Sequence, residues 1–152
     1  MFPRKYLITA ALLAVGVSAQ AATPQHCRML SEADALGLFE QWNASLKTGD
    51  PLQVAKLYQH DAVLLPTVSN SPRLTQAERV DYFSHFLADR PSGRLNSHHL
   101  KLGCDTATLA GLYTFDFAST GRQVAARYTF IYRWDGQAWL IDHHHSSLLP
   151  QS

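Results

Sequence analysis

The chain has 152 residues, with 13 Lys and Arg against 12 Asp and Glu, so its formal net charge at pH 7 is +1. This length fits one domain that is large enough to bury an ordinary core. The charges are balanced and no basic run stands out, which makes nucleic acid and acidic membrane surfaces poor candidate partners.

The first 21 residues have the features of a secretory signal. Arg4 and Lys5 precede an apolar run over residues 6–17, and Ser18-Ala19-Gln20-Ala21 supplies small residues for cleavage. The run is shorter than a membrane span requires. We therefore expect 1–21 to be a signal peptide and 22–152 to be one domain, secreted to a bacterial periplasm and free of the membrane. With 11 basic and 12 acidic residues left, its formal charge is −1.

Cys27 and Cys104 both lie in the expected mature chain. In an oxidising compartment, an even pair of cysteines favours a disulfide over two free thiols. Neither cysteine has the cationic or helix-start neighbours that would lower a thiol pKa, so a catalytic thiol is the weaker interpretation.

Helical patterns come first along the chain. Ser31 and Asp34 mark a helix start, and apolar residues recur at helical spacing to about residue 47. Asp50-Pro51 begins a second, short helix, since Asp suits the cap and Pro the first turn. A short apolar strand follows at 62–65. Thr75 and Glu78 have capping-box spacing and begin a third helix, over 75–89.

Strand patterns fill the rest of the chain, over residues 95–102, 107–117, 124–134 and 138–145. Asp135-Gly136 joins the last two as a hairpin turn, because glycine tolerates the positive φ of a two-residue turn. Helices followed by consecutive long strands predict an α+β fold, with helices packed on one face of a curved antiparallel sheet.

A family resemblance covers nearly the whole expected mature chain. The matching residues begin with Phe39-x-x-Trp42-Asn43, Gly49-Asp50-Pro51, Leu57-Tyr58 and Asp61-Ala62-Val63-Leu64-Leu65-Pro66. They continue with Asn96-x-His98, Gly103, Tyr128-Thr129-Phe130, Asp135-Gly136-x-x-Trp139 and His143-x-His145-Ser146-Ser147-x-x-Pro150. These motifs resemble the association domain of calcium/calmodulin-dependent protein kinase II, in its small secreted bacterial form. The order of elements is similar to the nuclear transport factor 2-like cone, in which a bent sheet wraps around a long helix.

The resemblance implies a domain that forms a homo-oligomer, a dimer or larger, and carries a pocket for a small carboxylate. No kinase signature is present, so phosphoryl transfer is not implied. His143 and His145 match the family's terminal His-x-His, whereas Ser146 stands where the hub domain has Arg. Related members of the superfamily are isomerases, dehydratases and cyclases, which keeps an enzyme with a His/Asp general base open as an alternative.

Strand alternation predicts which polar side chains line the pocket. It places Ile141, His143 and His145 on one face of the last strand. Arg127 lies mid-strand among apolar residues, so it needs a carboxylate such as Asp116 or Asp142, or an anionic ligand. Thr129 shares the face of Arg127, and His98 is the family match on the first long strand. The predicted ligand-binding residues are therefore Arg127, Thr129, His98, His143 and His145.

Other roles for these side chains stay open. His143 and His145 have a spacing that suits a metal, but no acidic ligand or fixed partner spacing accompanies them, and we expect neither a bound metal nor a cofactor. Tyr128, Phe130 and Tyr132 form an aromatic face that packs on a helix or on a second subunit. We expect a small polar or anionic ligand in the cavity, with an enzyme and a purely structural assembly domain as the alternatives.

Overall fold

The computed structural model describes residues 27–67 and 69–150. The predicted signal peptide, residues 1–21, falls outside this part of the chain. Within the described residues, no helix is both long and apolar enough to cross a membrane.

The helices and strands follow the predicted order. The helices are α1 (Glu32–Leu46), α2 (Pro51–Ala55), α3 (Gln76–Phe86) and a short 3-10 turn, η1 (Leu87–Asp89). The strands are β1 (Tyr58–Leu65), β2 (Pro91–Gly103), β3 (Thr106–Phe117), β4 (Arg122–Trp134) and β5 (Trp139–Leu148). Ser31 and Thr75 cap α1 and α3 with the two capping boxes that the spacing indicates, so the prediction of these helix starts is confirmed.

The strands form one sheet in the order β1-β5-β4-β3-β2. Four of them pair antiparallel as predicted, whereas β1 pairs parallel with β5. The α+β fold with a curved sheet is confirmed, and the parallel edge strand is the detail that strand patterns in the sequence do not specify. Register between distant segments depends on tertiary packing, because residues 66–138 lie between β1 and β5 in the chain.

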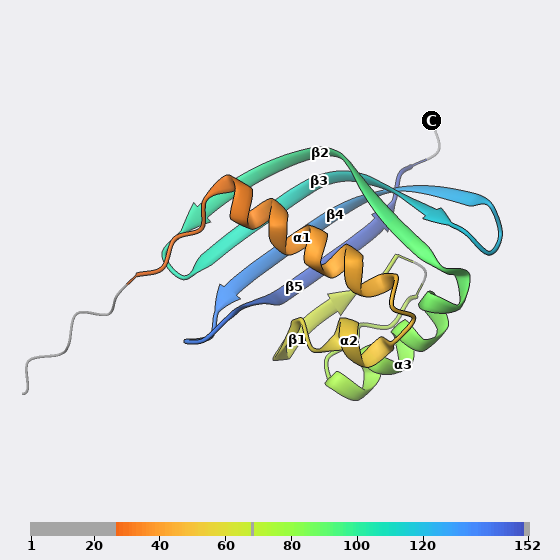
Figure 1. Cartoon of the computed structure of the whole chain (residues 1–152), viewed down its shortest axis with the longest axis horizontal. Coiled ribbons are helices and arrows are strands. Elements are labelled where there is room, and N and C mark those ends of the chain that lie inside the picture. The colour runs from red at the N-terminus through yellow and green to blue at the C-terminus, as the bar shows by residue number, and fades with distance from the viewer. Residues whose placement is uncertain (1–26, 68, 151–152) are drawn as a thin grey trace, which may run out of the picture.

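Helix α1 lies along the concave face of the sheet, and α2 and α3 lie beside β1 (Figure 1). Phe39 and Trp42 of α1 pack against Phe130 of β4, with ring centroids 5.9 and 5.2 Å apart. Tyr128, Phe130 and Tyr132 all face this core and are buried. The aromatic face of β4 therefore packs on the helix, and of the two partners that the sequence left open, a second subunit is excluded for these side chains.

A bulge in β5 changes the side-chain pattern that the sequence predicted. Ile131 pairs with His143 and Tyr132 pairs with Ile141, so Asp142 is an extra residue on β5. Simple alternation places Ile141, His143 and His145 on one face; His143 and His145 do share a face, but the prediction is wrong for Ile141, which lies on the other. Ile141 faces the core, and beyond the bulge His144 and Ser146 take that position.

Covalent and polar contacts tie the helices and the N-terminal segment to the sheet. Cys27 and Cys104 form the predicted disulfide, with their Cα atoms 5.2 Å apart. The Asn43 amide of α1 donates to the Gly93 carbonyl oxygen at 2.8 Å and accepts from the Gly93 N–H at 2.7 Å. Because two bonds run to one residue of β2, Asn43 fixes the position of α1 along the sheet.

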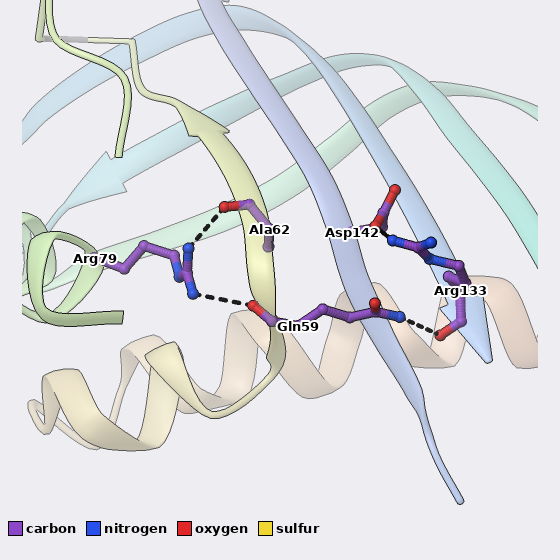
Figure 2. A network of polar contacts seen from close by, with 5 residues as sticks. All are labelled: Gln59, Ala62, Arg79, Arg133 and Asp142. Carbon is purple, nitrogen blue, oxygen red and sulfur yellow. Dashed lines mark hydrogen bonds and ion pairs between the residues drawn. The ribbon is translucent and has the colours of Figure 1, made fainter. Parts of the chain in front are cut away.

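Buried Arg79 of α3 holds the irregular edge strand. Its guanidinium donates to the carbonyl oxygens of Ala62 at 2.7 Å and Gln59 at 3.0 Å, as Figure 2 shows. It also donates to the carbonyl oxygen of His60 at 3.0 Å. The register of β1 against β5 shifts between Tyr58 and Val63, so these carbonyls lie where regular pairing is lost. Arg79 therefore replaces sheet hydrogen bonds that the bulged strand cannot make.

Candidate functional site

A small cavity lies between the core face of β3 and β5 and helices α1 and α3. Its volume is about 20 Å³, which is close to the minimum that holds one water. One wall is apolar and consists of Trp42, Leu64, Tyr82, Phe83, Phe86 and Phe115. The polar side chains that line it are Thr67, Tyr113, His144 and Ser146.

Three hydroxyl groups meet at the polar end of this cavity. The Tyr113 hydroxyl donates to Ser146 Oγ at 2.5 Å, and Ser146 Oγ also bonds Thr67 Oγ1. Tyr113 and Ser146 are buried, whereas Thr67 is only half-buried. The three groups therefore form a chain of hydroxyls that runs from the core toward the surface, and each of them can donate and accept a proton.

His144 supplies the fourth polar group, and its neighbours fix its tautomer. Trp42 Nε1 donates to the Tyr58 hydroxyl oxygen at 3.0 Å, and that hydroxyl lies 2.9 Å from His144 Nδ1. The indole can only donate, so the Tyr58 proton finds its acceptor at Nδ1. The neutral imidazole then carries its proton on Nε2, which is buried and has no partner within the described residues.

Burial keeps these groups uncharged. Desolvation lowers the pKa of His144 from 6.5 to about 3, with smaller contributions from His143 and His145. Desolvation also raises the pKa values of Tyr58 and Tyr113 well above 10. At neutral pH the cavity therefore offers three hydroxyls and one imidazole N–H, and its lining contains no Lys, Arg, Asp or Glu.

Such a site can bind a small ligand through hydrogen bonds alone. In the empty site the hydroxyls form hydrogen bonds with one another. A bound ligand would replace these hydrogen bonds with bonds to its own oxygens. A ligand with a highly localised charge would be costly here, because no opposite charge lines the cavity. An anion whose single charge is spread over several oxygens is the kind of charged group that such neutral donors can stabilise.

The structure places four of the five predicted ligand residues together, but on the outer face of the sheet. Thr129 pairs with His145, Ile131 with His143, and Arg127 with Ser147. All of them point away from α1, since the alternate residues of β4 form the core. Arg127 is exposed, so its charge is solvated and does not need the carboxylate or anionic ligand that a buried arginine would require. Ligand binding by Arg127, Thr129, His143 and His145 stays a prediction, and it would occur on the open face.

His98 lies elsewhere. It lies on β2, pairs with Gly111 of β3 and faces α1, where its Nε2 lies 3.1 Å from Glu32 Oε1. That position is near the start of α1, and His98 does not line the cavity. The structure therefore does not bring His98 together with the four residues of the outer face.

Sequence reasoning missed five site residues, which are Tyr58, Thr67, Tyr113, His144 and Ser146. One signal was available: three consecutive histidines must place at least one side chain on each face of a strand. The bulge at Asp142 determines which histidine faces inward, and no local sequence signal predicts this bulge. Within residues 27–67 and 69–150, no three His, Cys, Asp or Glu side chains gather in a way that could hold a metal ion.

The fold and the cavity together define a cone-shaped domain of the nuclear transport factor 2-like class. One solved structure of this class, an NTF2-like protein with a cystatin-like fold from Novosphingobium aromaticivorans, is similar with a TM-score of 0.66 and 16% identity. The similarity covers 79% of this chain and 82% of that one.

Residues 31–150 match the model of the calcium/calmodulin-dependent protein kinase II association domain family, and the chain belongs to this family. A Xanthomonas campestris protein assigned to the same domain is 42% identical, with a TM-score of 0.77 over 87% of this chain and 95% of that chain. The iota-carbonic anhydrase of a cyanobacterium, complexed with bicarbonate, is 18% identical, with a TM-score of 0.72 over 87% of this chain and 100% of that chain. No curated protein matches the sequence.

Proposed function

We propose that the inner cavity binds a small oxyanion, and that bicarbonate is its ligand. The observation that carries this proposal is the convergence of four neutral donors on one cavity: the hydroxyls of Thr67, Tyr113 and Ser146, and the Nε2–H of His144. A planar anion with three oxygens can accept all four hydrogen bonds. The cavity would have to widen severalfold to admit it, since the empty cavity holds only about one water.

Bicarbonate and carbon dioxide suit the two ends of the cavity. Carbon dioxide is small, neutral and linear, so the aromatic wall of Trp42, Phe83 and Phe115 would suit it once the cavity widened beyond the volume of one water. Bicarbonate has one charge spread over its oxygens, which suits donors that carry no formal charge. The bicarbonate complex of the cyanobacterial carbonic anhydrase supports this choice of ligand, although its low identity to the present chain establishes only a common fold.

The same arrangement supports the hydration of carbon dioxide as a candidate reaction. A water oxygen forms a bond to the carbon, one C–O double bond becomes a single bond to oxygen, and one proton is released. Hydroxyl donors around the carbon dioxide oxygens stabilise the charge that develops there. The Tyr113–Ser146–Thr67 chain offers a route for the released proton toward solvent, because each hydroxyl can accept one proton while donating another.

An isomerase or dehydratase that uses His144 as general base is less well supported. A base works best with a pKa near the operating pH, whereas burial holds the pKa of His144 at about 3. Asp142 does not orient this imidazole, because it lies at the bulge and pairs with Arg133. The hydrogen-bonding role of His144 is therefore the one that its surroundings favour.

The test uses two adjacent serines on opposite faces of β5. Ser146 lines the cavity, and Ser147 pairs with Arg127 on the outer face. Binding of ¹³C-bicarbonate is measured by NMR, and carbon dioxide hydration by stopped flow with a pH indicator. Ser146→Ala should weaken both at least tenfold, since it removes the hydroxyl that bonds the other two, and Ser147→Ala should change neither. Equal behaviour of the two variants, or no binding by the wild type, would refute the proposal.

We also propose that the domain self-associates through the outer face of the sheet, a role that fits the family to which it belongs. This face carries Arg127, Thr129, His143 and His145 beside Leu112, which is 39% exposed although it lies mid-sheet. Leu112→Asp should dissociate an oligomer without disturbing the core, as sedimentation velocity would show. Asn70→Asp, an equal charge change on an exposed loop, is the control. If neither variant dissociated the oligomer, this face would be excluded as the interface.

A further inference from the structure

A second hollow lies outside the inner cavity, on α3 and the turn between β3 and β4. Its volume is about 280 Å³, just below the range of about 300–1,000 Å³ that is common for ligand pockets. Its aromatic lining consists of Tyr82, Phe86 and Phe117. The size suits a molecule of one ring with a short polar substituent. We call this hollow the outer cleft.

The aromatic lining is ordered by its own packing. The rings of Tyr82 and Phe86 stack with centroids 5.6 Å apart and an angle of 17° between their planes. Phe117 meets Phe86 edge to face at 5.8 Å. These contacts hold the three rings in fixed orientations, so a further ring that entered the cleft could pack against them face to face or edge to face.

Arg73 lines the cleft as a cation, and the only carboxylate whose pKa it lowers among the described residues is Glu78, which lies beyond ion-pair distance and outside the lining. Its backbone forms a bridge with Leu64, which fixes its position at the edge of the sheet. The guanidinium donates to Ser69 Oγ at 3.3 Å and lies 5.9 Å from the centre of the Tyr82 ring, and its Nε is buried without a hydrogen-bond partner. Among the described residues, no Asp or Glu lies within ion-pair distance of it. A half-buried guanidinium of this kind is a receptor for a carboxylate.

Arg122 lines the same cleft. Its guanidinium lies over the Phe117 ring, 5.0 Å from the ring centre, and it too has no ion-pair partner in the described chain. Asp89 brings one negative charge to the lining, and His85 is 3.9 Å from Asp81, which lies outside it. Counting the lining alone, two arginines against one aspartate leave a surplus of one positive charge when His85 is neutral, and Glu78 outside the lining offsets part of the Arg73 charge. The cleft is therefore matched to a monoanion.

We propose that the outer cleft is a binding site for an aromatic monocarboxylate. The carboxylate pairs with Arg73, with Arg122 nearby, and the ring stacks on Tyr82, Phe86 and Phe117. This site differs in chemistry from the inner cavity, which has no cation in its lining. The two sites share Tyr82 and Phe86 as a common wall, so a ligand in one touches side chains that shape the other.

The test is isothermal titration with benzoate, using the full mature protein. Arg73→Gln and, independently, the exposed Arg122→Gln should each weaken benzoate binding at least fivefold, while Arg94→Gln, an exposed arginine outside the cleft, leaves it unchanged. Acetate, which lacks the ring, should bind at least tenfold more weakly than benzoate, and benzylamine, which has the ring but the opposite charge, should not bind. Circular dichroism melting confirms that each variant is folded.

Several outcomes would overturn the proposal. If neither Arg73→Gln nor Arg122→Gln changed the benzoate affinity, the site would be excluded. If acetate bound as tightly as benzoate, the aromatic lining would have no role in binding. Loss of benzoate binding in Ser146→Ala, with the arginine variants unaffected, would place the ligand in the inner cavity instead. Conversely, benzoate binding that survives in Ser146→Ala while bicarbonate binding is lost would show two separate sites.

Discussion

The hydroxyl of Tyr58 lies 2.9 Å from Nδ1 of His144 and joins the two parallel strands β1 and β5 inside the core. This contact places the imidazole proton on Nε2, which is buried without a hydrogen-bond partner among the described residues, in a side chain that lines the cavity. Tyr58→Phe should allow the His144 proton to occupy either ring nitrogen and should weaken bicarbonate binding severalfold. It should also lower the unfolding free energy by about 1–3 kcal/mol, because His144 Nδ1 and the Trp42 indole N–H both lose a buried hydrogen-bond partner. The ¹⁵N chemical shifts of His144 would report the tautomer directly.

Tyr132 provides the matched control for Tyr58. It is equally buried, but its hydroxyl has no hydrogen-bond partner within the described residues. Tyr132→Phe should therefore leave the His144 tautomer unchanged and keep or slightly raise the unfolding free energy. If the two Tyr→Phe variants lost the same stability, the Tyr58–His144 contact would have no special role.

The acid stability of the protein should depend on His144. Its pKa is lowered from 6.5 to about 3 by burial, so between these values the unfolded chain binds a proton that the folded chain excludes. The contribution is fully present above pH 6.5 and falls by about 1.4 kcal/mol per pH unit as the pH drops toward 3. Urea unfolding from pH 7 to pH 4 would measure the slope.

His144→Asn separates this contribution from those of other groups. The Asn side-chain oxygen can still accept the Tyr58 proton, but it does not titrate. The variant should lose stability less steeply on acidification than the wild type, whereas His99→Asn, at an exposed position, should keep the wild-type slope. Parallel curves for all three proteins would show that His144 does not control acid unfolding.

Arg79 should contribute far more stability than the other arginine of the same polar network. Arg79→Lys leaves carbonyl oxygens of β1 without donors, because one ammonium group cannot reach all three, and should cost about 2–4 kcal/mol. Arg133 pairs with Asp142 across a half-exposed surface (Figure 2), and Arg133→Lys should cost less than about 1 kcal/mol. Chemical unfolding of both variants tests this difference, and equal costs would contradict it.

The disulfide should stabilise the fold mainly by restricting the unfolded chain. Cys27 and Cys104 are 77 residues apart, and in the chain-entropy model a loop of this length contributes about 4 kcal/mol. The variant that combines Cys27→Ser and Cys104→Ser should unfold at correspondingly lower urea concentration, and a reductant should shift the wild type alone. A midpoint that reduction leaves unchanged would show that the bond contributes little.

Much of the fold could be predicted because its signals are local. Caps at Ser31 and Thr75, the Asp50-Pro51 helix start and the Asp135-Gly136 turn each act within a few residues, and the structure has an element boundary at every one of them. The pairing of Cys27 with Cys104 followed from there being only two cysteines. The parallel contact of β1 with β5 had no such local signal, because it joins segments far apart in the chain.

By itself, the sequence determined the class of fold, the order of its elements and the presence of polar side chains at the end of β5. Only the tertiary structure decided which of these side chains face inward. One extra residue at Asp142 shifts the alternation of the strand, and this shift buries His144 and Ser146 while it turns His143 and His145 outward. The period of a strand is two, so a bulge of one residue exchanges the faces of the strand beyond it, and the bulge is defined only by the register of β5 against β4.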